Sequence, residues 1–172
     1  MASLLPLIQD ILPMILPASV AVTKAADILP AQTQPAESES QREGEASGLR
    51  VICRNALVDK ADKMCASVLV VKPNSSSSVR HHGEQEAILY TVSGNGALLT
   101  QPEGDDEKPK RHEIGPGDFA FIPAWTEHQV VNESGVDFHL VVIRSGSKPV
   151  EVSLTDWGGP QTREEPQKPM TV

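Results

Sequence analysis

The stretch from Gly117 to Asn132, "GDFAFIPAWTEHQVVN", contains two short strand patterns separated by a proline. "FAFIP" is an apolar run that proline ends, because proline cannot donate a hydrogen bond to a sheet ladder. "EHQVVN" predicts a second strand, in which His128 faces the interior and Gln129 faces outward. This segment therefore predicts paired β-structure with a histidine turned towards the inside of the fold.

The same kind of pattern extends over residues 49–157, which read as short strands and turns without a sustained helical period. "LRVICRNALV" and "MCASVLVVKP" flank the turn sequence "DKAD", and "AILYTVSG" ends at Gly94-Asn95-Gly96, a hairpin signal. "GPGD", residues 115–118, predicts a tight turn before the next strand. About nine short strands of this spacing indicate an all-β barrel or sandwich.

The two ends of the chain differ from this middle part in composition. They are rich in Pro, Gln, Glu and Ser, which predicts extended and partly disordered segments. We therefore divide the 172 residues into an N-terminal extension and linker (1–48), a β-barrel (49–157) and a C-terminal tail (158–172).

The charge distribution argues against nucleic acid as a partner. The formal net charge is −8, shared equally between residues 1–48 and the rest of the chain. Neither part contains a cluster of basic residues of the kind that neutralises phosphates.

The compartment is predicted from the N-terminus and the cysteines. The apolar start of the chain is broken by Pro6, Pro13 and Pro17, which argues against both a secretory signal and a membrane span. Cys53 and Cys65 would be out of register for a disulfide, so we expect free thiols in a reducing compartment. These features predict a cytoplasmic protein without a membrane partner. Secretion stays the alternative, since Ser19-Val20-Ala21 resembles a cleavage site.

A second informative stretch, "RHHGEQEAILYTVSGNG", runs from Arg80 to Gly96. It places two adjacent histidines just before an acid-amide-acid triplet at the head of a predicted strand. Imidazole nitrogens bind divalent transition metals, and a carboxylate offsets the charge of the cation. This composition indicates a metal site if His128 converges on the same point.

Both stretches resemble signatures of the cupin family. Gly117, Pro123, His128 and Asn132 match the second cupin signature in type and spacing, and Trp125 stands where a second glycine is usual. The stretch from residue 80 to residue 96 is similar to the first signature, which reads His, one residue, His, three or four residues, Glu, six residues, Gly. The resemblance implies a single jelly-roll β-barrel, and many cupins hold one divalent metal inside it.

The first signature departs from the family pattern in two ways. Arg80 stands where the first histidine is usual, and seven residues instead of six separate Glu86 from Gly94. One residue must therefore be absorbed in a bulge or a reshaped loop. His82 and His128 are the expected metal ligands, and the third ligand is left open between Glu86, His81 and Gln85.

Other residues are assigned to the substrate and to proton transfer. Arg80 would pair with Glu86 or bind an anionic substrate, and Glu86 or His139 would move a proton. The predicted walls of the substrate pocket are Arg80, Tyr90, Phe121 and Trp125.

The resemblance leaves several functions open, because cupins host many activities. We expect a metal-dependent enzyme acting on a small organic molecule, an oxidoreductase of the dioxygenase type, with one divalent metal (Fe, Mn, Zn or Ni). The alternatives are a redox-neutral lyase or isomerase, and a non-enzymatic cupin that binds a small molecule or a metal. A homodimer is also expected.

Overall fold

The computed structural model describes residues 19–28, 50–102 and 108–162. These ranges contain eleven strands and one short helix, α2 (Ala25–Ile28). The predicted disorder of the two ends concerns residues that mostly lie outside these ranges. The proposed division at residues 48 and 157 stays a prediction.

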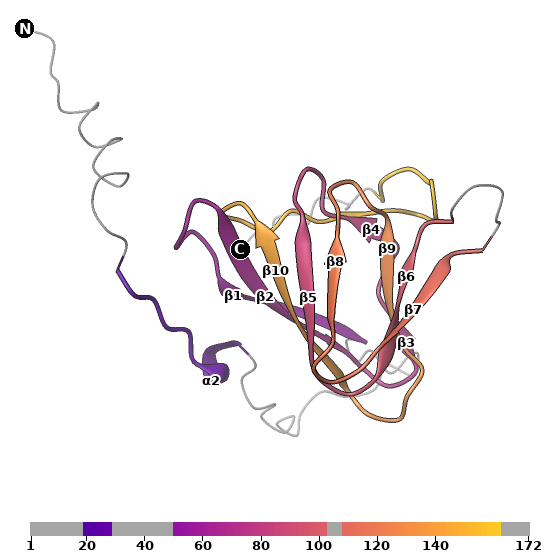
Figure 1. The fold of residues 1–172 in the computed structure, drawn as a ribbon, viewed down its shortest axis with the longest axis horizontal. Coiled ribbons are helices and arrows are strands. Elements are labelled where there is room, and N and C mark those ends of the chain that lie inside the picture. Colours follow the sequence, from indigo (N-terminus) through magenta and orange to yellow (C-terminus); the bar gives the residue numbers. More distant parts are fainter. Residues whose placement is uncertain (1–18, 29–49, 103–107, 163–172) are drawn as a thin grey trace, which may run out of the picture.

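The strands form two antiparallel sheets that face each other and crowd together at the lower end of the view (Figure 1). The first sheet has the order β1 (Val51–Leu57), β2 (Met64–Val71), β10 (Phe138–Ser145), β5 (Ala87–Ser93) and β8 (Phe119–Ile122). The second has the order β11 (Val152–Ser153), β4 (Arg80–His81), β9 (His128–Asn132), β6 (Gly96–Thr100) and β7 (Lys110–Ile114), and β3 (Ser75–Ser76) pairs with β9. This arrangement confirms the predicted all-β jelly roll.

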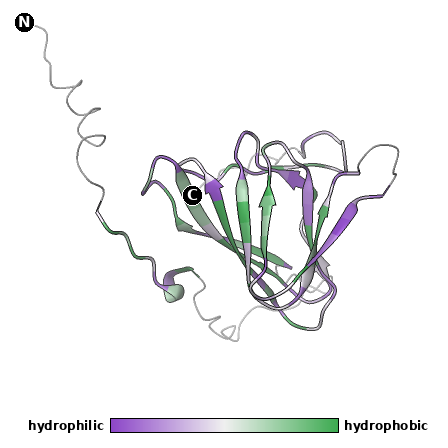
Figure 2. Cartoon of the chain, in the orientation of Figure 1, coloured by the Kyte–Doolittle hydropathy of each residue, from purple (hydrophilic) through white to green (hydrophobic). Residues whose placement is uncertain are grey.

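The core lies between the sheets and follows from the alternation along each strand. Burying each large apolar side chain contributes about 1.5–3 kcal/mol to folding. Figure 2 shows the apolar character concentrated on β5, β8 and β10, whereas β7 is hydrophilic. The buried cluster includes Leu69, Val71, Leu89, Leu98, Ile122, Val130, Phe138 and Leu140.

The first predicted hairpin is confirmed. β1 pairs with β2, and Cys53 lies opposite Leu69 instead of Cys65. The two thiols are therefore free, with Cys53 exposed and Cys65 buried.

The hairpin predicted at Gly94-Asn95-Gly96 is wrong. β5 pairs with β10 and β8, whereas β6 pairs with β9 and β7, so the chain crosses from one sheet to the other at this turn. The glycines serve the crossing: Gly94 has a φ of 78°, and a Cβ atom at Gly96 would lie 2.5 Å from the Phe138 ring. Close approach of the two sheets, not a hairpin, requires these residues.

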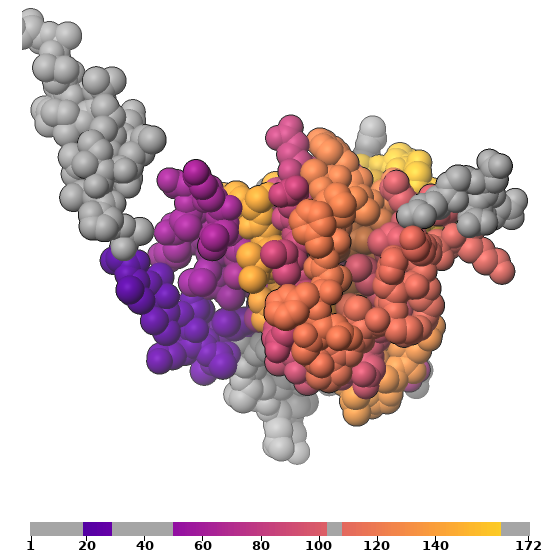
Figure 3. Space-filling model, in the orientation of Figure 1, coloured from indigo at the N-terminus to yellow at the C-terminus, as the bar shows by residue number. Residues whose placement is uncertain are grey.

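Residues 19–28 lie against the hairpin of β1 and β2 (Figure 3). The hydroxyl of Thr23 donates a hydrogen bond of 2.6 Å to the carbonyl of Ala56. Among the described residues, no helix is long and apolar enough to cross a membrane. Most of the N-terminal apolar stretch lies outside the described residues.

Asn132 braces the turn between β9 and β10. It is fully buried, its amide nitrogen donates to the carbonyls of Val71 and Val136 at 2.8 and 2.7 Å, and its amide oxygen accepts from the backbone and hydroxyl of Ser134. One side chain thus satisfies polar groups of three residues, one in β2 and two in the turn. This explains an asparagine at the end of the signature stretch on structural grounds alone.

Replacing Asn132 with alanine should destabilise the fold by about 2–3 kcal/mol, because buried carbonyls lose their donors. Urea denaturation measures this difference, and Asn95→Ala, at an exposed position of the loop between β5 and β6, should cost less than about 0.5 kcal/mol. Equal losses in the two variants would contradict the bracing role of Asn132.

Candidate functional site

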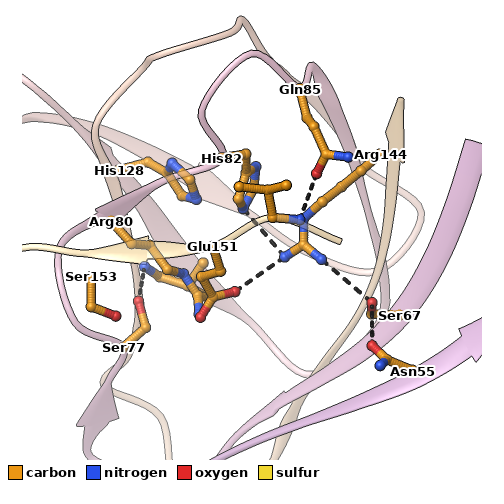
Figure 4. A network of polar contacts seen from close by, with 12 residues as sticks. Asn55, Ser67, Ser77, Arg80, His82, Gln85, His128, Arg144, Glu151 and Ser153 are labelled. Atoms are coloured by element: carbon orange, nitrogen blue, oxygen red, sulfur yellow. Dashed lines mark hydrogen bonds and ion pairs between the residues drawn. The ribbon is translucent and has the colours of Figure 1, made fainter. Parts of the chain in front are cut away.

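Two histidines from different strands meet inside the fold. His82 directly follows β4, and His128 begins β9, the strand that pairs with β4 at Arg80. The ring centroids of His82 and His128 are 4.5 Å apart with an interplanar angle of 65°. The two side chains lie side by side in Figure 4, and both residues are buried, with exposures of 2% and 1%.

Burial keeps both imidazoles neutral near pH 7. It lowers the pKa of His82 to about 2, and the neighbouring His128 and the nearby arginines act in the same direction. Burial also lowers the pKa of His128 to about 4, although a hydrogen bond to the Thr126 carbonyl opposes this shift. Neutral imidazole is the form that accepts protons and binds metals.

The two rings differ in their hydrogen bonds. Nδ1 of His128 lies 3.0 Å from the carbonyl oxygen of Thr126, which makes Nδ1 the protonated nitrogen and leaves Nε2 as an acceptor. Nε2 of His82 lies 3.3 Å from Nη2 of Arg144, which can only donate. Nδ1 of His82 is buried and has no hydrogen-bond partner in the part of the chain that the structure describes.

Two buried arginines share one carboxylate beside this pair. Nη1 of Arg80 lies 2.6 Å from Oε1 of Glu151, and Nη2 of Arg144 lies 3.2 Å from Oε2. The side chains of Arg80 and Arg144 are 6% and 2% exposed, whereas that of Glu151 is 33% exposed. Burial lowers the pKa of Arg144, and the charge of Glu151 opposes this shift.

Glu151 is carried by the segment of residues 146–151, which we call the strap. Gln85 holds this strap with its whole amide: Nε2 donates to the Lys148 carbonyl, and Oε1 accepts from the Val150 backbone, each at 2.7 Å. Figure 4 shows the amide of Gln85 turned to the strap, away from His128. Gln85, a candidate metal ligand from the sequence, therefore has its polar atoms committed to the backbone.

Glu86 lies outside the histidine pair. Its neighbours Gln85 and Ala87 are buried, so Glu86 points outward and is exposed. It lines an open groove on the outer surface together with Lys63, Ile88 and Phe121. The structure thus does not bring Glu86, the predicted carboxylate ligand, to His82 and His128. It also does not pair Glu86 with Arg80.

Two of the aromatic residues predicted to line the pocket also face outward. Tyr90 and Phe121 lie on the outer face of the first sheet, where the Tyr90 ring packs on Phe119 at 4.6 Å and Phe121 is 60% exposed. The inward positions of β5 belong to Leu89 and Thr91. A shift of one residue in strand parity accounts for Tyr90, and Phe121 pairs with the outward-facing Ile88 on the same face.

His81, at the end of β4, lies next to Trp125, in the loop before β9. Their ring centroids are 5.4 Å apart, and Nδ1 of His81 accepts a hydrogen bond from the backbone of Gly83. Trp125 is 61% exposed. His81 thus packs on this exposed indole and does not join the contact between the other two histidines.

His139 lies away from the site. It shares the outer side of β10 with Val141, and its Nε2 is 3.9 Å from Oδ2 of Asp137. The structure therefore does not support the assignment of His139 to proton transfer.

Sequence reasoning missed Arg144 and Glu151. The burial pattern of β10 places Phe138, Leu140, Val142 and Arg144 on the inner face, so the alternation alone could have pointed Arg144 inward. Figure 2 shows this end of β10 as hydrophilic. No comparable signal exists for Glu151, because the strap is held by Gln85 and not by strand alternation.

The stability of metal-free protein should fall as the pH drops below 6.5. Both histidines have lower pKa values in the folded state than the ordinary 6.5, so the unfolded chain binds protons first. Each histidine should cost about 1.4 kcal/mol per pH unit in this window. Denaturation of wild type and His128→Gln between pH 4 and 6.5 measures how the free energy of unfolding changes with pH. The slope of the variant should be smaller by the contribution of one histidine. Unchanged slopes would contradict a buried neutral His128, and exposed His112→Gln is the control.

Trp125 has a φ of 61°, a conformation that residues other than glycine rarely adopt. This explains the usual glycine at its place in the cupin signature. Trp125→Gly should therefore be more stable than Trp125→Ala by about 1 kcal/mol, since both lose the indole but only alanine keeps the backbone strain. Thermal or urea denaturation compares them, and equal stability would contradict strain at this position.

Comparison with known proteins agrees with this fold. Residues 67–144 match the family model of the cupin domain. No curated protein matches the sequence. Among solved structures, the chain is similar to a polyketide cyclase from Streptomyces resistomycificus, at 25% identity and a TM-score of 0.50, with 63% of this chain and 75% of that chain covered.

Two further solved structures share the fold. One is an uncharacterized conserved protein with a double-stranded beta-helix domain from Klebsiella pneumoniae (14% identity, TM-score 0.52, covering 67% of this chain and 97% of that chain). The other is an oxalate decarboxylase from Lactobacillus farciminis (16% identity, TM-score 0.52, covering 59% and 31%). The chain spans half or less of the length of several solved proteins that it matches. The matched family model and the shared jelly roll show that residues 67–144 form a cupin domain.

Proposed function

We propose that this chain is a metal-dependent cupin enzyme that acts on a small organic molecule bound beside His82 and His128. The observation that carries the proposal is the contact of two buried imidazoles, whose pKa values are lowered to about 2 and about 4. Structural histidines are usually satisfied by hydrogen bonds, whereas Nδ1 of His82 has no partner. The polyketide cyclase at 25% identity supports chemistry on an organic substrate.

The two imidazoles fit a divalent transition metal. His128 is oriented by its hydrogen bond to Thr126, an arrangement that commonly positions a metal-binding histidine. Within the described ranges, no group of three or more His, Cys, Asp or Glu residues could hold a metal, so we assign two protein ligands, His82 and His128. When bound, Fe, Mn, Zn or Ni would supply a Lewis acid that polarises substrate oxygen atoms.

Arg144 competes with a metal for His82. Its guanidinium donates to Nε2 of His82, and its positive charge opposes a cation at the same place. A metal at this nitrogen must therefore displace the hydrogen bond from Arg144. We expect Arg144→Met to bind divalent metals more tightly than wild type if it folds.

The reaction class depends on the third ligand. The expectation of an oxidoreductase rested on two histidines and one carboxylate, the arrangement of non-haem iron oxygenases. Because Glu86 lies outside the pair, a redox-neutral lyase or isomerase reaction is a second candidate. In that reaction a bound metal would serve as a Lewis acid without changing its oxidation state.

Metal analysis of the purified full chain tests the proposal. The chain is loaded with Fe²⁺, Mn²⁺, Zn²⁺ or Ni²⁺ without oxygen, freed of unbound metal and measured by elemental analysis. Wild type should retain about one equivalent of at least one metal, and His82→Ala and His128→Ala should each lose at least about tenfold in affinity. His112→Ala and Glu86→Ala, which change exposed residues, should retain it.

The outcomes separate the candidate functions. No metal retained by wild type would contradict the proposal and favour a metal-free binding protein. Full metal content in both His82→Ala and His128→Ala would contradict the assignment of these two residues as ligands. Oxygen uptake by the iron-loaded protein with an organic substrate would favour the oxidoreductase, whereas conversion without oxygen would favour the redox-neutral enzyme.

A further inference from the structure

The two buried arginines of this cupin carry more positive charge than the acid beside them neutralises. Arg80 and Arg144 are nearly fully buried, and among the described residues the one acid that pairs with both is Glu151. Within the same residues, the buried Nε of each arginine has no hydrogen-bond partner. Since arginine keeps its proton in proteins, the cluster of Arg80, Arg144 and Glu151 carries one excess positive charge.

An uncompensated buried charge is costly, and a purely structural cluster would avoid it. Burying a charge without a counter-ion costs several kcal/mol in real proteins. The nearest hydrogen-bonding neighbours of Arg144 besides Glu151 are the hydroxyl of Ser67, at 3.4 Å, and Nε2 of His82, at 3.3 Å. Both neighbours are neutral, so neither supplies the missing negative charge.

Glu151 sits between these arginines and the solvent. Its side chain is 33% exposed, whereas those of Arg80 and Arg144 are 6% and 2% exposed. The strap is held at Lys148 and Val150 by Gln85, through bonds that do not involve the side chain of Glu151. The carboxylate of Glu151 can therefore turn towards solvent while the backbone of the strap stays in place.

We propose that Arg80 and Arg144 bind the carboxylate of a small organic acid, and that the Glu151 carboxylate is an internal competitor for the same donors. The two arginines already hold a carboxylate with one contact per oxygen, which matches the two oxygens of a ligand acid. Nη2 of Arg144 also contacts His82, so the bound acid would lie next to the histidine pair (Figure 4). This inference rests on the proposed function only in that the acid occupies the same interior as the proposed substrate. It adds the chemical class of that substrate.

Titration calorimetry on the metal-free full chain tests the inference. The probes are acetate and benzoate, the neutral isosteres acetamide and benzamide, and inorganic phosphate. A carboxylate should bind at least tenfold more tightly than its amide. Arg80→Gln and Arg144→Gln should each reduce this binding at least tenfold.

Glu151→Gln gives the most specific result, because it removes the competitor and keeps both guanidinium groups. It should bind the carboxylate at least tenfold more tightly than wild type. Its melting temperature should be lower without ligand, since two buried guanidinium groups lose their counter-ion, and should recover when carboxylate is added. Glu84→Gln, which removes the same charge at an exposed position, should match wild type in both measurements. Glu151→Gln and Glu84→Gln test the inference even if the arginine variants fail to fold.

Four results would overturn the inference: equal affinity for carboxylate and amide, binding of phosphate but not carboxylate, no gain in Glu151→Gln, or no binding at all. Its failure is distinguishable from failure of the proposed metal function. Carboxylate binding is measured without metal and is tested at Arg80, Arg144 and Glu151, whereas the metal function is tested by the metal content of His82→Ala and His128→Ala, so either result can fail while the other holds.

Discussion

The site depends on one shared ionic contact, in which the carboxylate of Glu151 reaches the guanidinium groups of Arg80 and Arg144. This contact joins β4 to β10 and to the strap that directly follows β10, and both lie far from β4 in the sequence. Without it, two permanent positive charges would face each other in a buried space, where charges interact far more strongly than in water. The contact therefore sets the electrostatic character of the interior.

The positive electrostatic character of the interior decides what His82 and His128 can bind. Burial and the neighbouring arginines keep His82 and His128 neutral, so both rings can accept a proton or bind a metal. The same positive charges disfavour a bare cation and favour an anion. A metal and an organic carboxylate are therefore complementary occupants, because the negative charge of the acid offsets the charges that a metal would otherwise face.

Much of the fold followed from the sequence, because strand alternation and the spacing of Gly117, Pro123, His128 and Asn132 reflect local constraints. The approach of His82 to His128 also followed from that spacing, whereas their role as metal ligands stays a prediction. The residues around the pair were harder to place. One extra residue before Gly94 reverses the parity that would have turned Glu86 inward, and it moves Tyr90 to the outer face with it. Glu151 could not be found at all, since a contact between distant segments through an irregular strap leaves no periodic signal.

A double-mutant cycle between Arg144 and Glu151 tests the central contact most directly. Urea denaturation of wild type, Arg144→Met, Glu151→Gln and the double variant gives the coupling free energy between the two side chains. We predict a favourable coupling of about 1–3 kcal/mol, because removing either partner leaves the other without its counter-charge. Additivity within about 0.3 kcal/mol would show that Glu151 does not pair with Arg144 inside the fold, and would contradict this account of the site.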